Sequence, residues 1–248
     1  MNFIVCVKQA PDSESRLQTL DDHVNLDSQV APGVINPLDE YALEAAVQLK
    51  AQKGGSVLAL MLGQEDDLPL LKHCLAAGAD EAVLLVRDGQ GWISARQTAL
   101  ALASEISSHP FDIIFCGRQS YDGQNAQTGN LIAARLGLPC ITAVTTLSID
   151  NQELLAERDL DGVSETIECQ LPCVLTVEKG INKPRYPSLR EILQARQKPL
   201  IVKPINLTHS CFKPQQLVFP ETQRRNQILG QGPEAVPAIV EIIRTALN

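Results

Sequence analysis

The stretch FDIIFCGRQSYDGQNAQTGNLIAARLGLP, residues 111–139, decides how this chain folds. It opens with a short apolar run, residues 111–116, which is brief and rich in β-forming residues, as expected of a buried strand. A polar loop with glycines follows, and apolar residues then return at helical spacing until Gly137 and Pro139 end the helix. The segment therefore predicts a strand, a polar loop and the N-terminus of a helix.

A loop of this kind suits a nucleotide. The start of a helix directs free N–H groups, and a partial positive charge of about half an elementary charge, toward whatever lies above the loop. Ser120, Asn125, Gln127 and Thr128 add polar side chains without negative charge. The loop matches neither GxGxxG nor the P-loop pattern, and a plain strand-to-helix connection looks much the same. The interpretation as a nucleotide site therefore depends on the rest of the chain.

Strands and helices alternate before this stretch. Apolar runs predict strands at residues 3–7, 56–62 and 81–86. Helical spacing predicts a helix that opens at residues 36–40 and is closed by Gly54-Gly55, and further helices at residues 66–77 and 94–108. Such alternation is typical of βαβ units around a parallel sheet with right-handed connections. We expect an α/β fold with a Rossmann-like core, of the adenine nucleotide alpha hydrolase-like kind, over about residues 1–140.

The regular alternation of strands and helices stops after Pro139. Residues 141–149, 153–159, 165–171 and 173–178 are predicted strands with little helix between them. The second and third of these are expected to form a hairpin across Asp161-Gly162, a strong turn signal. We expect them to add an antiparallel extension to a mostly parallel sheet.

Residues 180–199, GINKPRYPSLREILQARQKP, form a different kind of segment. Pro184 and Pro187 hold the backbone extended, and Ser188 can cap a short helix over residues 189–196. Such a stiff, exposed segment is suited to contacting a partner, although it could also be a plain connector.

The C-terminal part lacks sustained periodicity over residues 200–232 and ends in an amphipathic helix at residues 233–247. An arm with so few apolar anchors would be costly to order alone. We therefore expect two parts, a domain over residues 1–199 and an arm over residues 200–248 that packs on a partner subunit.

The amino-acid composition argues against several classes of function. A net charge of −8 argues against nucleic acid as a partner, since phosphates require a basic surface. Apolar runs stay well short of the roughly 18–20 residues of a membrane span, so we expect no membrane insertion, and the start, MNFIVCVKQ, lacks a signal-peptide pattern. The seven cysteines include no CxxC pair, which favours reduced, buried thiols and a cytoplasmic location. The histidines lack metal-ligand spacing, so no metal is expected.

Six segments, in order along the chain, resemble the β subunit of electron transfer flavoproteins. They are VCVKQAPD (5–12), INPLDEYALEAAVQLK (35–50), CLAAGADEAVLL (74–85), FCGRQSYDGQNAQTG (115–129), LDGVSETIECQLPCVLT (160–176) and INKPRYPSLREI (181–192). The last is close to the family's signature segment. Because the matches are collinear and cover the chain end to end, they are far more specific than one loop.

The resemblance implies a heterodimer with an α subunit that carries the redox-active FAD. Such a complex accepts electrons from acyl-CoA or other primary dehydrogenases and passes them to a membrane-bound quinone oxidoreductase or another acceptor. The β subunit is then an electron-carrier subunit, not an enzyme. It holds a nucleotide in its Rossmann-like core, which is AMP in the respiratory branch and a second FAD in the electron-bifurcating branch.

The resemblance also implies which residues line the nucleotide pocket. They are Cys6, Ala10, Asn36, Pro37, Leu38, Asp39, Leu62, Asp122, Gly123, Gln124, Asn125, Ala126, Gln127, Thr128 and Gly129. Backbone N–H groups near Gln127 to Gly129 would take phosphate oxygens, and the backbones of residues 7–10 and 36–39 would read the adenine edge. Cys6 and Leu62 would contribute walls, although core packing alone would also explain them.

Two further roles follow from the resemblance. Glu165 matches a carboxylate that reaches toward the flavin domain of the α subunit, although an exposed glutamate at this place could simply be solvated. Leu189 matches a hydrophobic anchor for the partner dehydrogenase, in a recognition segment that includes Pro184, Arg185 and Tyr186. Burial of Leu189 against its own helix is the alternative.

Segments that resemble two branches of the family bear on the identity of the nucleotide. INPLDEYALE and GRQSYDG resemble the bifurcating branch, whereas Gln127-Thr128-Gly129 resembles the respiratory branch. We expect AMP, with a second FAD in a bifurcating complex as the alternative. An adenine-nucleotide hydrolase would share the fold, but the SGGxD-type loop that it needs is absent from the sequence. A nucleotide sensor of the universal-stress type would lack residues 180–248.

Overall fold

The computed structural model describes residues 1–21, 24, 26–27, 30–88, 92–150, 153–207, 215–218 and 227–247. The chain divides by its own contacts into two units, Met1–Gln216 and Leu217–Asn248. Each unit is described by itself.

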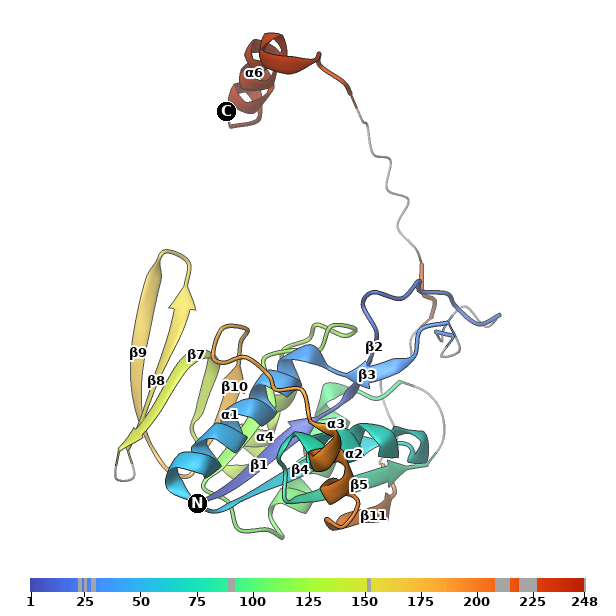
Figure 1. The fold of residues 1–248 in the computed structure, drawn as a ribbon, viewed down its shortest axis with the longest axis vertical. Helices are drawn as coiled ribbons and strands as arrows, with labels where there is room; N and C mark the ends of the chain where they lie inside the picture. Colours follow the sequence, from blue (N-terminus) through green and yellow to red (C-terminus); the bar gives the residue numbers. More distant parts are fainter. Residues whose placement is uncertain are drawn as a thin grey trace. The chain divides into compact units, whose positions relative to one another are not determined.

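Nine strands of the described residues form one sheet in the first unit (Figure 1). In spatial order they are β11 (Leu200–Ile205), β5 (Glu81–Arg87), β4 (Ser56–Gly63), β1 (Asn2–Val7), β6 (Ile113–Gly117), β10 (Cys173–Val177), β7 (Cys140–Asp150), β8 (Glu153–Leu160) and β9 (Val163–Gln170). Neighbours from β11 to β7 are parallel, and the β7–β8 and β8–β9 pairs are antiparallel. This confirms the expected α/β fold, including the hairpin across Asp161-Gly162.

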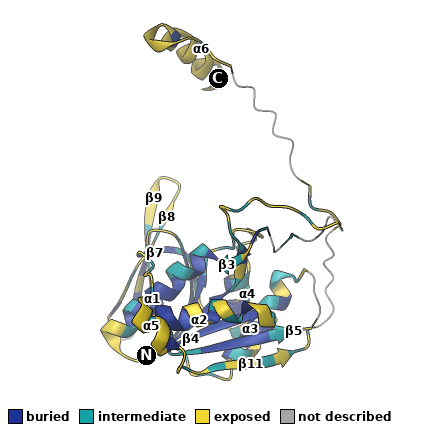
Figure 2. Cartoon of the chain, turned by 45° about the vertical axis from the view of Figure 1, so that its right-hand side comes forward, coloured by how far each residue is buried: buried dark blue, intermediate teal, exposed yellow. Residues whose placement is uncertain are grey.

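Helices cover both faces of the sheet. One face carries α1 (Pro37–Lys53), α2 (Leu68–Ala77) and α5 (Leu189–Ala195), and the other carries α3 (Ala95–Ile106) and α4 (Thr128–Leu136). In β1, Phe3, Val5 and Val7 face the first layer, whereas Ile4 and Cys6 face the second, as the two-residue period of a strand requires. Figure 2 shows the central strands buried between the two layers.

Local signals set the ends of the helices as predicted. Ser94 and Ser188 form capping boxes at the starts of α3 and α5, and each side chain accepts a hydrogen bond from a backbone N–H of the first turn. Gly137 ends α4 in the left-handed conformation, at φ 68°. A short 3₁₀ helix, η1 (Glu65–Asp67), precedes α2. A separate two-stranded sheet pairs β2 (Gln9–Pro11) with β3 (Gly33–Ile35) beside the end of β1.

The place of β10 in the sheet was not predicted. This strand follows the β8–β9 hairpin in sequence but lies between β6 and β7, parallel to both. All five of its residues are buried, which is the pattern of an interior strand. In the hairpin, β8 alternates exposed and buried residues over its first half and β9 alternates exposed and intermediate ones, and the hairpin occupies the edge of the sheet.

The expected boundary at residues 199/200 needs correction. Leu200–Ile205, predicted as the start of the arm, is the edge strand β11 and pairs in parallel with β5. Its apolar run is only three residues long, residues 200–202, before Lys203 and Pro204, and all of its residues are intermediate or exposed. Backbone hydrogen bonds along one side of the strand hold it in place. The division between the two units falls after Gln216.

The second unit contains η2 (Gly232–Ala235) and the predicted terminal helix, α6 (Val236–Leu247). No residue of α6 is buried within the described part of the chain, although the helix carries Ile239, Ile242 and Ile243. Cys211 and the Arg224-Arg225 pair lie outside the described residues. None of the described helices is both long and apolar enough to cross a bilayer.

Candidate functional site

The predicted nucleotide residues come together at the carboxyl ends of β1 and β6. These strands are parallel neighbours in the sheet, with Cys6 opposite Cys116, so the segments that follow Val7 and Gly117 leave the sheet at the same edge. The loop of residues 118–127 leaves β6 here and leads to α4. The N-terminus of α1 joins them because the backbone N–H of Asn36 donates to the carbonyl of Lys8 at 2.9 Å. Ligands commonly bind at this edge of an open α/β sheet.

Asn36 connects α1 to the loop. Its side chain is buried, and its Nδ2 donates to the Gln119 carbonyl at 3.0 Å while its Oδ1 accepts from the Tyr121 N–H at 3.1 Å. The amide therefore acts as a brace that fixes the first part of the loop. Both polar atoms of the side chain therefore have hydrogen-bond partners within the protein.

Asp39 links the carboxyl ends of β1 and β6. The residue is 6% exposed, and its carboxylate accepts the backbone N–H groups of Lys8, at 2.9 Å, and of Gly117, at 3.1 Å. Burial raises the pKa of Asp39 to about 7, although hydrogen bonds from Asn36, Lys8 and Gly117 act in the opposite direction. Gly117 has to be glycine, since a Cβ there would lie 2.3 Å from Asp39 Oδ1. The carboxylate thus faces the backbone N–H groups at the ends of β1 and β6.

The loop itself is held in an unusual conformation. Gln124 and Ala126 have φ angles of 48° and 50°, in the left-handed region that side chains disfavour. Gly123 N–H donates to Ser120 Oγ at 3.2 Å, and Asn130 Nδ2 donates to the Ala126 carbonyl at 3.0 Å. The loop leads into α4 at Thr128, where the first N–H groups of the helix have no intrahelical acceptor.

The remaining predicted residues form the surroundings of this edge. Cys6 and Leu62 are buried in the core on the side of α3 and α4, while Ala10, in β2, and Leu38, in α1, are buried beside the strand ends. Pro37 begins α1, where its missing N–H costs nothing. The wall role of Cys6 and Leu62, and the adenine contacts of the backbones of residues 7–10 and 36–39, stay predictions.

The contact made by the Lys8 side chain was not predicted from the sequence. Its ammonium contacts both carboxylate oxygens of Asp122, at 2.8 and 2.6 Å. Burial acts to raise the pKa of Asp122, but the charge and hydrogen bonds of Lys8 outweigh it and hold that pKa below its ordinary value. A lysine directly after a buried strand, in VCVKQ, was the available signal.

Glu165 lies in β9 and is not merely solvated. Arg158, opposite it in β8, donates from Nε to Glu165 Oε2 at 2.6 Å. Arg158 Nη1 also donates to Thr142 Oγ1 at 3.0 Å, which ties the pair to β7. The carboxylate is therefore held at a defined place on the hairpin, with about half of its side-chain surface open to solvent (45%).

The recognition segment is fastened to α1. Arg185 binds Glu44 through two hydrogen bonds, of 2.7 and 2.9 Å, and Asn182 Nδ2 donates to the Tyr41 carbonyl at 2.9 Å. Tyr186 and Leu189 remain 93% and 74% exposed. Leu189 is thus not covered by its own helix, and Arg185 acts within the protein, holding the segment in place.

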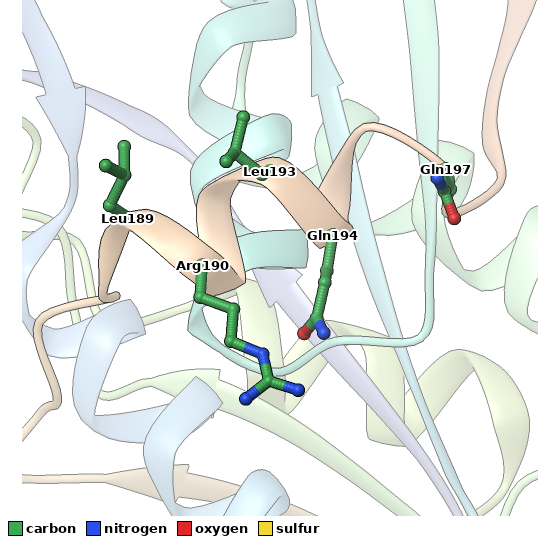
Figure 3. Close-up of a pocket in the computed structure, with 5 residues that line it drawn as sticks. All are labelled: Leu189, Arg190, Leu193, Gln194 and Gln197. Atoms are coloured by element: carbon green, nitrogen blue, oxygen red, sulfur yellow. The ribbon is translucent and has the colours of Figure 1, made fainter.

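An open groove of about 530 Å³ lies on α5, lined by Leu189, Arg190, Leu193, Gln194 and Gln197. Figure 3 shows Leu189 and Leu193 on one side of the helix, and Arg190 and Gln194 on the other. A second hollow, of about 440 Å³, lies at the amino ends of the strands, beside Met1 and Asp112. The α5 groove coincides with the recognition segment and not with the nucleotide loop.

Comparison with known proteins identifies the family. The family model described as the electron transfer flavoprotein domain matches residues 24–206. The electron transfer flavoprotein subunit beta of Thermoanaerobacterium thermosaccharolyticum is 35% identical over 254 residues, covering 97% of each chain. The corresponding subunit of Bacillus subtilis is 37% identical, covering 81% of this chain and 77% of the relative. The caffeyl-CoA reductase-Etf complex subunit CarD of Acetobacterium woodii is 35% identical, covering 82% of this chain and 78% of the relative. This chain therefore belongs to the electron transfer flavoprotein β-subunit family.

Proposed function

We propose that this chain is the β subunit of a heterodimeric electron transfer flavoprotein. In this role it accepts electrons from primary dehydrogenases, acyl-CoA dehydrogenases among them, and passes them to a quinone oxidoreductase or another acceptor. The α subunit holds the redox-active FAD. The buried free thiols Cys6, Cys74, Cys116 and Cys173 suit a cytoplasmic complex.

We further propose that AMP occupies the edge formed by β1, β6 and α4. The observation that carries this proposal is the braced loop, which Asn36 and Asp39 connect to α1 and which ends at the N-terminus of α4. The residues fit an anionic nucleotide because both nearby carboxylates are occupied, Asp39 by backbone N–H groups and Asp122 by Lys8. The N–H groups of Thr128 and Gly129 would hold the phosphate.

The nucleotides released by denaturing the complex test this proposal. We expect one AMP and one FAD per heterodimer, measured by chromatography against standards. A folded complex that releases neither AMP nor a second FAD would refute the nucleotide site. We expect the nucleotide to have a structural role. The sequence predicts no residue at this edge that would make or break bonds in the nucleotide.

A second candidate is a subunit of an electron-bifurcating complex that holds a second FAD at the same edge. The similarity to the caffeyl-CoA reductase-Etf complex subunit favours this possibility. Two FAD and no AMP per heterodimer would support this candidate and would make the loop part of a redox site.

The exposed surfaces fit two kinds of partner. We propose that Glu165, held by Arg158, contacts the flavin domain of the α subunit. Leu189 and Tyr186, both largely exposed on a segment fastened by Arg185, would anchor the partner dehydrogenase. Tyrosine is among the residues enriched at interface hot spots, where truncation of a side chain costs about 2 kcal/mol or more.

We expect removal of residues 217–248 to abolish the heterodimer while the first unit stays folded. The reason is that α6 carries Ile239, Ile242 and Ile243 exposed within its own unit, and clustered exposed apolar side chains of this kind are typical of an interface with a partner. Size-exclusion chromatography with the α subunit measures association, and circular dichroism measures folding. A truncated chain that still co-elutes with the α subunit would contradict this role of the arm.

A further inference from the structure

Lys8 occupies a fixed place at the carboxyl end of β1. Its backbone N–H donates to Asp39 Oδ2, and its carbonyl accepts from the N–H of Asn36, both at 2.9 Å. Because Asp39 and Asn36 are themselves buried, the Cα of Lys8 cannot shift without breaking these contacts. The side chain therefore extends from a rigid base.

The ammonium of Lys8 meets the middle of the nucleotide loop. It contacts both oxygens of Asp122, and the carboxylate also accepts the N–H of Gly123 at 2.7 Å. The other hydrogen bonds described for this part of the loop are local. Gln124 bonds to the carbonyls of residues 120 and 121, and Ala126 bonds to the side chain of residue 130.

The backbone conformation of the loop requires stabilising contacts from the rest of the protein. Left-handed conformations at Gln124 and Ala126 each cost about 1–2 kcal/mol, and they persist only where the surrounding contacts hold the backbone. The Lys8–Asp122 ion pair joins the strained part of the loop to the end of β1. The same part of the loop leads directly into the first turn of α4.

We infer that Lys8 is a positioning residue of the nucleotide site: its ion pair with Asp122 fastens residues 122–127 to β1 and so sets where the first N–H groups of α4 meet the phosphate. This inference rests on the proposed function, since it concerns the same site. In this assignment Asp122 serves the loop and is not itself a ligand of the phosphate.

The test uses four variants of the full complex, stripped of nucleotide and titrated with AMP and separately with FAD. Lys8→Gln and Asp122→Asn should each weaken binding about tenfold, the effect of losing about 1.4 kcal/mol. The double variant should be no weaker than either single one, because both changes remove the same link. Lys8→Arg keeps the ion pair and should retain most of the affinity.

Lys50→Gln is the matched control. It also removes a lysine–aspartate ion pair, with Asp80 at 2.9 Å, but at the other end of α1. Because it changes the net charge as Lys8→Gln does, it corrects for long-range attraction of the anionic ligand. Nucleotide affinity should be unchanged in this variant.

Hydrogen exchange in the absence of nucleotide provides a readout that does not depend on binding. Amides of residues 122–127 should exchange faster in Lys8→Gln and Asp122→Asn, and not in Lys50→Gln. If the wild-type complex binds neither AMP nor FAD, the proposed nucleotide site fails, while exchange still decides whether the ion pair orders the loop. If Lys8→Gln weakens binding but Asp122→Asn does not, Lys8 is a direct phosphate ligand and the inference is overturned. Unchanged exchange in both variants would also overturn it.

Discussion

Replacing Gly129 with alanine is expected to destabilise the protein by about 1–2 kcal/mol and to lower its nucleotide content. A Cβ at this position would lie 2.6 Å from Thr176 Cγ2, in the closely packed contact between α4 and β10. Thr176 is buried and cannot simply rotate, since its Oγ1 accepts the N–H of Ala143 at 3.1 Å. Overpacking of this kind costs about 1–3 kcal/mol, and the better helix propensity of alanine recovers up to about 1 kcal/mol.

A second substitution makes this prediction sharper. Thr176→Ser removes the methyl group but keeps the hydroxyl, so Gly129→Ala should cost little in that background. Thr176→Ser alone should cost about 0.5–1.5 kcal/mol, as expected for the loss of one buried methyl. The measurement is chemical denaturation of the full chain. An equal cost of Gly129→Ala in both backgrounds would show that the methyl group is not the obstacle.

Gly123→Ala in the same loop serves as the steric control. Its added Cβ would lie 3.3 Å from Ser120 Oγ, a contact that a small shift of the hydroxyl can relieve. The free energy of unfolding should therefore change by no more than about 0.5 kcal/mol.

Replacing Arg185 with glutamine should cost about 1–3 kcal/mol and loosen the recognition segment. Glu44 is buried on α1, and its carboxylate takes both hydrogen bonds from Arg185 and a third from Gln48. Losing one partner of a fully buried ion pair costs about 3–5 kcal/mol. The expected cost is smaller here because the Arg185 side chain is 39% exposed, so water can approach the remaining carboxylate.

Glu44→Gln provides the rescue for this variant. With both residues neutral, no charge is left without a partner, so the double variant should be more stable than Arg185→Gln alone. Arg118→Gln breaks the more exposed ion pair with Glu178 and should cost less than about 1 kcal/mol. If Arg185→Gln proves as mild as Arg118→Gln, the brace between the segment and α1 contributes little.

The stability that the Arg185–Glu44 ion pair contributes should decrease as the pH falls. Burial acts to raise the pKa of Glu44, but hydrogen bonds from Arg185 and Gln48 outweigh it and hold that pKa below its ordinary value of 4.5. A lowered acid pKa contributes stability that is present above about pH 4.5 and is lost as the pH falls through the lowered value. The difference between wild type and Arg185→Gln should therefore be largest near neutral pH and shrink in acid.

Much of the fold could be predicted from the sequence because its signals are local. The apolar run ending at Cys116, the caps at Ser94 and Ser188, and the stop at Gly137 each depend on a few neighbouring residues. They predicted most strands and helices of the first unit, with β2, β3 and β11 as the exceptions, and placed a polar loop between β6 and α4. The family resemblance added the residues of the candidate site, including Asn36 and Asp39.

Only the tertiary structure decided which residues meet. No local pattern shows that β10 lies between β6 and β7 or that β11 completes the sheet, because strand order depends on long-range pairing. Nor does any local pattern pair Lys8 with Asp122 or Arg185 with Glu44, which are 114 and 141 residues apart in the chain. The sequence thus determined most of the elements and the place of the candidate site. The packing of distant segments decided that Asn36, Asp39 and Arg185 act as braces, since the partner of a buried polar group is known only once the chain has folded.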